Sequence, residues 1–349
     1  MGHDRRAQRH SGLASRHAHC FRSRCRRKWS ASDCGAIDRP IHAVDVGCRE
    51  GIRPEWRALG PYGSLIGFEA DPEECARLNA GAVADEEFYE PIALAASSGD
   101  ATLHLTVDPQ SASLYAPNEE AVRRHPELWR HASRGTTTVA TTTLDAWTER
   151  RSGPIDVLKI DVQGAELDVL RGAERSLASV RALELEVEFQ SLYVHQPLFG
   201  DVDEFLRQRG FILWRLRDVA HCGLTSSRRD EAAFTVGDAV EKTRVGGQIT
   251  WANAVYVRSE MGDPGLHEDW ETSARDACVA AMFDLPELVE LALERARAGA
   301  PAKPRRTLSS QLALARRRAN RRRLHGLFWG APQHASGFVA ARLQRRSRG

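Results

Sequence analysis

The sequence lacks the features that would define a membrane protein or a disulfide-rich protein. No apolar run among its 349 residues approaches the roughly 20 residues that cross a bilayer, and the start of the chain has no apolar core of a signal peptide. The seven cysteines are odd in number and scattered, and they include no CxxC pair, so we expect neither a disulfide framework nor a zinc site. These absences predict a chain that works in a reducing, cytoplasmic setting.

Acidic residues are missing from one end of the chain, and basic residues are concentrated at both ends. Residues 300–349 carry 13 Lys and Arg and no acid, and residues 1–38 carry nine basic and three acidic residues. The region between them, 39–299, has 27 basic and 44 acidic residues, a net charge of −17. We therefore expect an acidic globule between two basic, largely disordered arms. An acidic body does not attract polyanions, which argues against a nucleic-acid substrate in the central site.

Apolar runs of strand length alternate with stretches of helical periodicity from Ile41 onward. This alternation predicts an α/β fold with a doubly wound, mostly parallel sheet. The polar span before the last apolar run contains no clear helix, which indicates an antiparallel final strand. The expected strands lie at 41–46, 64–69, 87–94, 157–160, 182–189, 211–217 and 250–258, and alternating patterns at 101–107 and 135–144 indicate a paired excursion.

The polar stretch at 117–134, between the two strands of that excursion, is expected to form a mobile flap. Past residue 260 the pattern becomes helical, with helices expected at 270–283 and 285–298. We thus predict a main domain at 39–260 and a helical extension at 261–299. The sequence contains no internal repeats.

The most informative stretch is VLKIDVQGAELDVLRGA, residues 157–173. A short apolar run, typical of a buried strand, ends at Asp161, and Gln163 and Gly164 then turn the chain into a helix. In that helix we expect Leu167 and Leu170 to face the core and Glu166 to face water. An acid at the carboxyl end of a parallel strand lies where ligands bind in open α/β sheets. Taken alone, Asp161 is equally consistent with a solvated turn.

Two further signals fall on the same edge of the predicted sheet. In VDVGCREG, Asp45 ends the first strand, and Gly47 and Gly51 let the backbone approach a ligand closely, although an ordinary turn could use the same glycines. Their spacing differs from the G-x-G-x-x-G of dinucleotide sites. Glu69 ends the second strand, 22 residues after Gly47, where an acid binds ribose hydroxyls. A ribose-binding acid without a phosphate-binding pattern favours S-adenosylmethionine, whose positive groups suit an acidic site.

These motifs resemble the FkbM family of S-adenosylmethionine-dependent methyltransferases. The resemblance is carried by VDVGCREG, IGFEADP, TTLDAW and LKIDVQGAELDVLRGA, and it covers roughly residues 41–258. It implies a class I methyltransferase fold, a Rossmann-like sheet of seven strands, and methyl transfer to a hydroxyl oxygen of a sugar, a polyketide or a similar metabolite. Many relatives have Glu at the position of Gln163. The glutamine of this chain keeps the hydrogen-bonding shape of that glutamate but carries no charge.

Methyl transfer requires a group that takes the proton of the acceptor oxygen. The candidates are Asp161 and His195, a loop histidine whose pKa suits the task but which an exposed surface position would equally explain. Gln163, Glu188 and Tyr193 are expected to bind a small-molecule or saccharide acceptor. No HxxxH pair lies beside the acids, so we expect no metal.

Two alternatives to a methyltransferase remain open at this stage. One is a nicotinamide-dependent oxidoreductase on a related sheet. The other is a non-catalytic nucleotide-binding protein whose basic arms dock on nucleic acid or an anionic membrane. The sequence leaves open the acceptor, the choice between O- and N-methylation, and the oligomeric state.

Overall fold

The computed structural model describes residues 37, 39–82, 87–151, 153–222, 231–236, 239–244, 247–265 and 269–329. The expected N-terminal arm lies outside the described residues, apart from Ile37. The strands are β1 (Ile41–Val46), β2 (Gly63–Phe68), β3 (Glu87–Glu90), β4 (Ala93–Leu94), β5 (Gly99–Thr106), β6 (Ser133–Thr142), β7 (Val157–Ile160), β8 (Ala182–Glu188), β9 (Phe211–Cys222), β10 (Glu231–Val236), β11 (Ala239–Arg244) and β12 (Gln248–Arg258). The α-helices are α2 (Pro72–Ala80), α3 (Glu119–Arg124), α4 (Leu144–Thr148), α5 (Glu166–Arg171), α6 (Phe199–Arg207), α7 (Ser259–Gly262), α8 (Trp270–Met282), α9 (Pro286–Gly299) and α10 (Ala302–Trp329), and the 3₁₀ helices are η2 (Trp56–Tyr62), η3 (Pro109–Ser111), η4 (Pro126–His131) and η5 (Ser176–Ala178).

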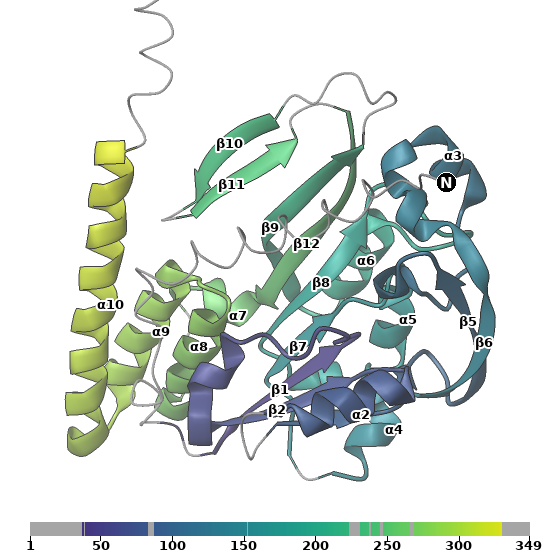
Figure 1. Cartoon of the computed structure of the whole chain (residues 1–349). Coiled ribbons are helices and arrows are strands. Elements are labelled where there is room, and N and C mark those ends of the chain that lie inside the picture. Colours follow the sequence, from purple (N-terminus) through teal and green to yellow (C-terminus); the bar gives the residue numbers. More distant parts are fainter. Residues whose placement is uncertain are drawn as a thin grey trace, which may run out of the picture.

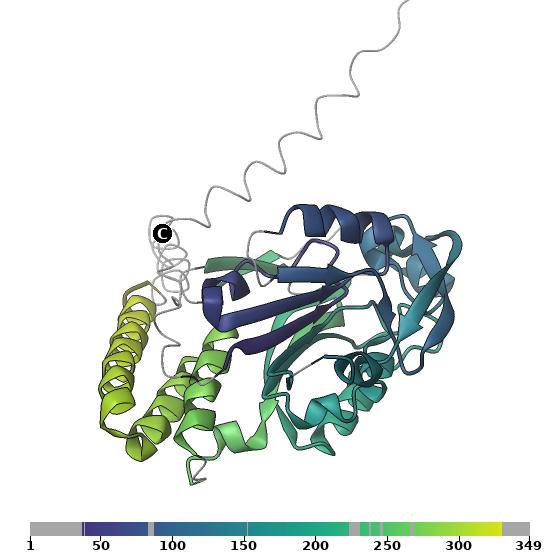
Figure 2. The same ribbon diagram turned by 90° about the horizontal axis from the view of Figure 1, so that it is seen from below.

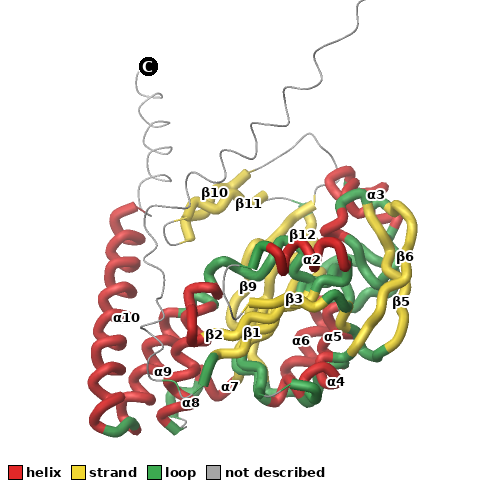
Figure 3. The backbone as a smooth tube through the Cα atoms, turned by 60° about the horizontal axis from the view of Figure 1, so that its bottom comes forward, coloured by secondary structure: helices red, strands yellow, loops and turns green. Residues whose placement is uncertain are grey.

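A seven-stranded sheet with the order β3-β2-β1-β7-β8-β12-β9 forms the centre of the molecule (Figure 1). Strands β3, β2, β1, β7 and β8 pair in parallel, whereas β12 runs antiparallel to both of its neighbours. The predicted fold, a mostly parallel sheet with an antiparallel last strand, is therefore confirmed. The polar span before β12 holds a hairpin, β10–β11, which forms its own two-stranded sheet and is set apart from the main one (Figure 3).

The two faces of the sheet pack against different helices. One core joins β1, β7, β8 and β12 to α2, η2, α8 and α9, with Trp56, Val157, Ala182, Val279 and Phe283 almost fully buried. The other core joins the opposite face of the same strands to α5 and α6. The helices predicted at 270–283 and 285–298 are confirmed as α8 and α9. At the other end of the molecule from α10 lies the β5–β6 pair (Figure 2).

The paired excursion is confirmed, because β5 and β6 are antiparallel neighbours in a second, three-stranded sheet with β4. Between them lies a segment that we call the cap segment, residues 107–132. The structure differs here from the expected mobile flap, since the segment contains η3, α3 and η4. It is fixed to the loop after β8 by backbone hydrogen bonds from Asn118 N to Leu192 O (2.8 Å) and from Val194 N to Ala116 O (2.7 Å).

The structure also differs from the expected disordered tail over Ala302–Trp329, which form α10. Leu308 and Leu312 are 1% and 4% exposed, and with Ala315 they follow the spacing of one helix face. They join the core that contains α8 and α9. The many arginines around these positions conceal this short apolar stripe in the sequence. Residues 330–349 lie outside the described part of the chain. Among the described helices, none combines the length and hydrophobicity needed to cross a bilayer.

Candidate active site

The glycine loop after β1 meets the end of β7 so closely that a side chain cannot fit between them. Gly47 has φ of +78°, and a Cβ placed on it would lie 1.9 Å from the carbonyl oxygen of Asp161. The amide of Asp161 donates to Val46 O across the same junction (2.9 Å). The structure therefore brings Gly47 and Asp161 together, as the sequence predicts for two residues at one edge of the sheet. Gly51, in the same loop, also has a positive φ, +86°.

Glu69 follows β2 at this edge and is 6% exposed. Its Oε1 accepts a hydrogen bond from Asp71 N (2.9 Å) and lies 3.7 Å from Nη1 of Arg49. Burial raises the pKa of Glu69, and the hydrogen bond and Arg49 oppose the shift. Arg49, which the sequence analysis did not single out, also pairs with Asp71 (3.1 Å). It thus connects the glycine loop to the acid expected to bind ribose.

Asp45 lies within β1, one residue before its end. It is 1% exposed and accepts a hydrogen bond from Lys159 Nζ at 3.1 Å, while the same ammonium lies 3.6 Å from Asp161. Burial raises the pKa of Asp45, with Lys159 opposing the shift. Burial would lower the pKa of Lys159, yet Asp45 and Asp161 raise it above its usual range. Within the described residues, Lys159 is the only cation that β7 brings to this edge, and Asp45 holds it in position.

Gln163 connects two of the other expected site residues, Asp161 and Tyr193, and one that the sequence analysis missed, Glu186. Its backbone is left-handed, with φ of 59°. Its Nε2 donates to Asp161 Oδ1 (3.1 Å) and to Glu186 Oε2 (2.5 Å), and its Oε1 accepts from the hydroxyl of Tyr193 (3.1 Å). A left-handed non-glycine residue is strained, and such strain is found where the surrounding structure fixes it, often at functional sites.

Glu166 was predicted to face water, and this prediction is wrong, because its side chain is 2% exposed. Its carboxylate accepts hydrogen bonds from the amides of Val162 (2.9 Å) and Gly164 (3.2 Å). The amides of a tight turn before a helix have no partner within the helix, and Glu166 supplies one. Burial nevertheless raises the pKa of Glu166 to about 7. The turn itself requires glycine, since Gly164 has φ of +95° and a Cβ there would lie 2.9 Å from the ring of Tyr193.

Strand β8 places three glutamates on one face by simple alternation. Glu184 pairs with Arg53 and with Arg217 (3.4 Å), whereas Glu186 bonds to Gln163. Glu188 is 2% exposed. Burial raises the pKa of both Glu186 and Glu188, and the neighbouring carboxylates add to the effect. The sequence analysis singled out Glu188 alone, although the pattern LELEVE carries the signal for all three.

The face that carries these glutamates changes character along its strands. Near the start of the strands it is apolar, with neighbouring residues in register at Ala43, Val157 and Ala182. Two residues further along, the neighbours in register are Asp45, Lys159 and Glu184. At the carboxyl edge come Asp161, Glu186 and Glu188. Within the described ranges, no group of three or more His, Cys, Asp or Glu side chains is placed to hold a metal ion.

The loop after β8 sends one predicted residue into the site and another into solvent. Tyr193 is fully buried, and its hydroxyl donates to Ser111 O of the cap segment (2.8 Å). Burial raises its pKa well above the usual range. His195, a candidate base, has an exposed side chain and a left-handed backbone with φ of 62°. The structure therefore does not place His195 among the residues that Gln163 connects.

The cap segment covers this edge by contacting three elements of the domain. Gln110 donates to Glu50 of the glycine loop (2.7 Å), and Tyr115 donates to Asp168 of α5 (2.9 Å). Leu128 packs with Tyr193 in a small core of its own. The sequence analysis read this segment only as polar, because its few anchoring residues have no periodic pattern.

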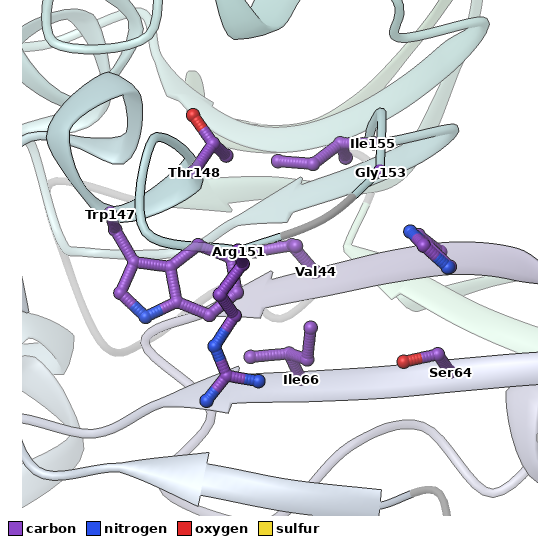
Figure 4. Close-up of a pocket in the computed structure, with 9 residues that line it drawn as sticks. Val44, Ser64, Ile66, Trp147, Thr148, Arg151, Gly153 and Ile155 are labelled. Atoms are coloured by element: carbon purple, nitrogen blue, oxygen red, sulfur yellow. The ribbon is translucent and has the colours of Figure 1, made fainter.

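A cavity of about 390 Å³ lies elsewhere, on the opposite face of β1 and β2 beside α4 (Figure 4). Val44 and Ile66 form its sheet side, and the guanidinium of Arg151 lies 4.7 Å from the ring centre of Trp147. His42 and Ser64, near the starts of their strands, also line it. This cavity is therefore separate from the carboxyl edge and from every predicted site residue.

The strand order and the antiparallel β12 are those of the class I methyltransferase fold. Residues 42–213 match the family model described as the methyltransferase FkbM domain, and this part of the chain belongs to that family. The curated 2-O-methyltransferase NoeI of Sinorhizobium fredii is 29% identical over 176 residues, which cover 48% of this chain and 72% of NoeI.

Similar solved structures include two methyltransferases. Methyltransferase FkbM from Methylobacillus flagellatus has 12% identity and a TM-score of 0.34, covering 66% of this chain and 48% of that one. Magnesium protoporphyrin IX methyltransferase from Synechocystis, with S-adenosylmethionine bound, has 10% identity and a TM-score of 0.32, covering 63% of this chain and 71% of that one.

Proposed function

We propose that this protein transfers a methyl group from S-adenosylmethionine to a hydroxyl oxygen of a saccharide or a related metabolite. The observation that carries the proposal is the junction at the carboxyl edge. There the glycine loop touches Asp161, and Gln163 connects Asp161 to Glu186 and Tyr193. The family match identifies the class of reaction, and the likeness to NoeI, a 2-O-methyltransferase by name, favours oxygen as the acceptor atom.

The residues present fit the proposed cofactor. Gly47 and Gly51 leave their loop without side chains where the backbone would approach the ligand, and Glu69 offers a carboxylate to a ribose diol. The described cations at this edge, Arg49 and Lys159, are both held by carboxylates. An edge with this excess of acid suits a ligand with positive ammonium and sulfonium groups and disfavours a diphosphate. When bound, S-adenosylmethionine supplies an electrophilic methyl group.

The chain's own residues supply orientation, a proton acceptor and shielding from water. Amide, carboxylate and phenol groups at Gln163, Glu186 and Tyr193 match the hydroxyl groups of a polyol, which both donate and accept hydrogen bonds. Holding one acceptor oxygen in line contributes through proximity, and a carboxylate at the edge receives its proton. The cap segment, fixed to the glycine loop and to the loop after β8, limits access of water to the reacting groups.

A thermal-shift experiment with S-adenosylhomocysteine, NADH and an RNA oligomer separates this proposal from its alternatives. We expect stabilisation by S-adenosylhomocysteine alone, because ligands raise the unfolding temperature only when they bind the folded state. Mass spectrometry of a metabolite extract incubated with the protein and S-adenosylmethionine should then show a product heavier by one methylene group. Stabilisation by NADH or RNA without a response to S-adenosylhomocysteine would contradict the proposal.

A further inference from the structure

We propose that Glu186 and Glu188 hold protons in the cofactor-free protein and lose protons when the positive cofactor binds, which lets this pair distinguish the cofactor from its neutral product. Glu186 then receives the proton of the acceptor hydroxyl. This inference rests on the proposed function, and it assigns the proton acceptor to neither of the residues that the sequence favoured.

The charge balance around Glu186 is the first observation. The groups around it are Lys159 from β7, Asp161 directly after β7, Gln163 from the turn, Glu166 from α5, Glu184 and Glu188 from β8, Tyr193 from the following loop and Asn253 from β12. Lys159 is held by Asp45 and Asp161, and Arg53 and Arg217 are held by Glu184. No described cation is therefore left to pair with Glu166, Glu186 or Glu188.

Burial makes this imbalance costly if all the carboxyls are ionised. Glu166 and Glu188 are each 2% exposed and Glu186 is half-buried, and a carboxylate shielded from water without a cation takes up a proton rather than keep its charge. Glu166 has two backbone amides that favour its charged form, whereas within the described part of the chain Glu186 accepts from one neutral donor, Gln163. The pair on β8 is thus the part of the cluster best suited to hold protons.

A second observation points to a ligand at the same place. Gln196 is 7% exposed, and its Nε2 has no hydrogen-bond partner among the residues that the structure describes. The opposite end of its amide is fixed, because Oε1 accepts from Tyr193 N (2.5 Å). Its Nε2 lies beside the turn, 3.2 Å from where a Cβ of Gly164 would be. A buried donor without a partner is costly, and an oxygen of a bound acceptor would satisfy it.

These groups give a cycle in which protons and charges balance. A positive ligand at the edge favours the ionised carboxylates, so protons leave Glu186 and Glu188 for solvent as the cofactor binds. As the new oxygen–carbon bond forms and the sulfur–carbon bond breaks, the hydroxyl proton passes to the carboxylate of Glu186. The products are a neutral methyl ether and neutral S-adenosylhomocysteine, and Glu186 is again protonated. As the neutral product leaves, Glu188 takes up a proton from solvent, which restores the starting state.

Calorimetry tests this cycle without an acceptor. Binding of S-adenosylmethionine and of S-adenosylhomocysteine is measured at one pH in phosphate and in Tris, whose different ionisation enthalpies reveal the number of protons released. We expect about 0.5–1 more proton released with S-adenosylmethionine for each of the two carboxyls. Glu186→Gln should remove about half of this difference, the share of Glu186, because its amide keeps a hydrogen bond but cannot titrate. His195→Ala, which removes the exposed histidine of the loop after β8, should leave the difference unchanged.

Measurements on the unmodified protein keep the test decisive if the Gln variant does not fold. The preference for S-adenosylmethionine over S-adenosylhomocysteine should rise with pH, by up to about tenfold per unit for one linked proton. Equal proton release for the two ligands, or loss of the difference in His195→Ala, would overturn the inference. Failure of both ligands to bind would instead contradict the proposed function. With an acceptor found by mass spectrometry, Glu186→Gln should lose about 10²-fold or more in methyl transfer, and full activity would overturn the role of Glu186.

Discussion

The contact between Gly47 and the end of β7 makes Gly47→Ala the most direct test of how the site is built. The glycine has φ of +78°, and the new Cβ would meet the backbone oxygen of Asp161 at 1.9 Å and its carbonyl carbon at 2.8 Å. Backbone atoms cannot rotate away as a flexible side chain would, so the loop and the strand must separate. That separation moves Asp161, the residue on which the expected cofactor and acceptor contacts converge.

The size of the effect follows from two contributions. A left-handed non-glycine residue costs about 1–3 kcal/mol. Separating the loop from β7 weakens the hydrogen bond from Asp161 N to Val46 O, worth about 0.5–1.5 kcal/mol. We therefore expect Gly47→Ala to lower the free energy of unfolding by about 2–4 kcal/mol and to weaken S-adenosylhomocysteine binding by at least tenfold.

Gly51→Ala is the matched control in the same loop. Gly51 has a similar φ of +86°, but a Cβ there would meet nothing closer than the hydroxyl of Tyr89 at 3.3 Å. It should show the backbone cost alone, about 1–3 kcal/mol, with little loss of affinity. Urea unfolding followed by circular dichroism and calorimetry with S-adenosylhomocysteine measure both quantities. Equal losses in the two variants, or full affinity in Gly47→Ala, would refute the reasoning.

Four further predictions concern other parts of the chain. Glu69→Ala should weaken S-adenosylmethionine binding by about 1.5–3 kcal/mol, the worth of a charge-assisted hydrogen bond, and unchanged affinity by calorimetry would remove Glu69 from the site. Asp161→Asn keeps the acceptor for Gln163 but loses the charge that would balance the positive cofactor, so it should fold normally and lose on the order of 10²-fold in methyl transfer; a fully active variant would show that this stretch has only a structural role. The folded protein holds the Glu166 proton up to about pH 7, whereas an unfolded glutamate releases it near 4.3, so stability should fall as pH rises between these values. Denaturation at pH 5 and at pH 8 should show that the free energy of unfolding falls by on the order of 1–3 kcal/mol over this interval. The fall should be smaller in Glu166→Gln, and a free energy of unfolding that rises over the interval would contradict the prediction. A chain spanning residues 39–299 should still bind S-adenosylhomocysteine but melt below one spanning 39–329, because it loses the buried Leu308 and Leu312 of α10; equal melting temperatures would show that α10 adds no stability.

The strands and the edge of the sheet could be predicted because their signals are local. Buried strands ending in Asp161 and near Glu69, and glycines at Gly47 and Gly164, appear directly in the sequence. A local pattern does not show which residues, distant in sequence or in a neighbouring turn, contact a given side chain in the folded protein. Glu166 has the spacing of a solvent-facing helix residue, yet the preceding turn folds its amides around the carboxylate.

The remaining differences have the same origin. Lys159 interrupts an apolar strand, and only its neighbours in register, Asp45 and Glu184, explain a charge in that position. The acids of β8 alternate as in any half-exposed strand, and the cap segment that covers them comes from residues 107–132, far away in sequence. The packing of α10 depends on a few apolar residues among many arginines, so composition alone suggests a solvated tail.

The change from apolar to acidic along one sheet face separates the sources of stability and reactivity within the same strands. Val157 and Ala182 lie in the core with α8 and α9, whereas Glu188 is a buried acid at the far end of β8. On such a face, whether a substitution changes stability or activity depends on its position along the strand. Neutral substitutions at the acidic end, such as Glu188→Gln, should therefore raise the melting temperature and lower the turnover rate. A homologue from a hotter environment would have to gain its stability at the apolar end, or in α8, α9 and α10, to keep its chemistry.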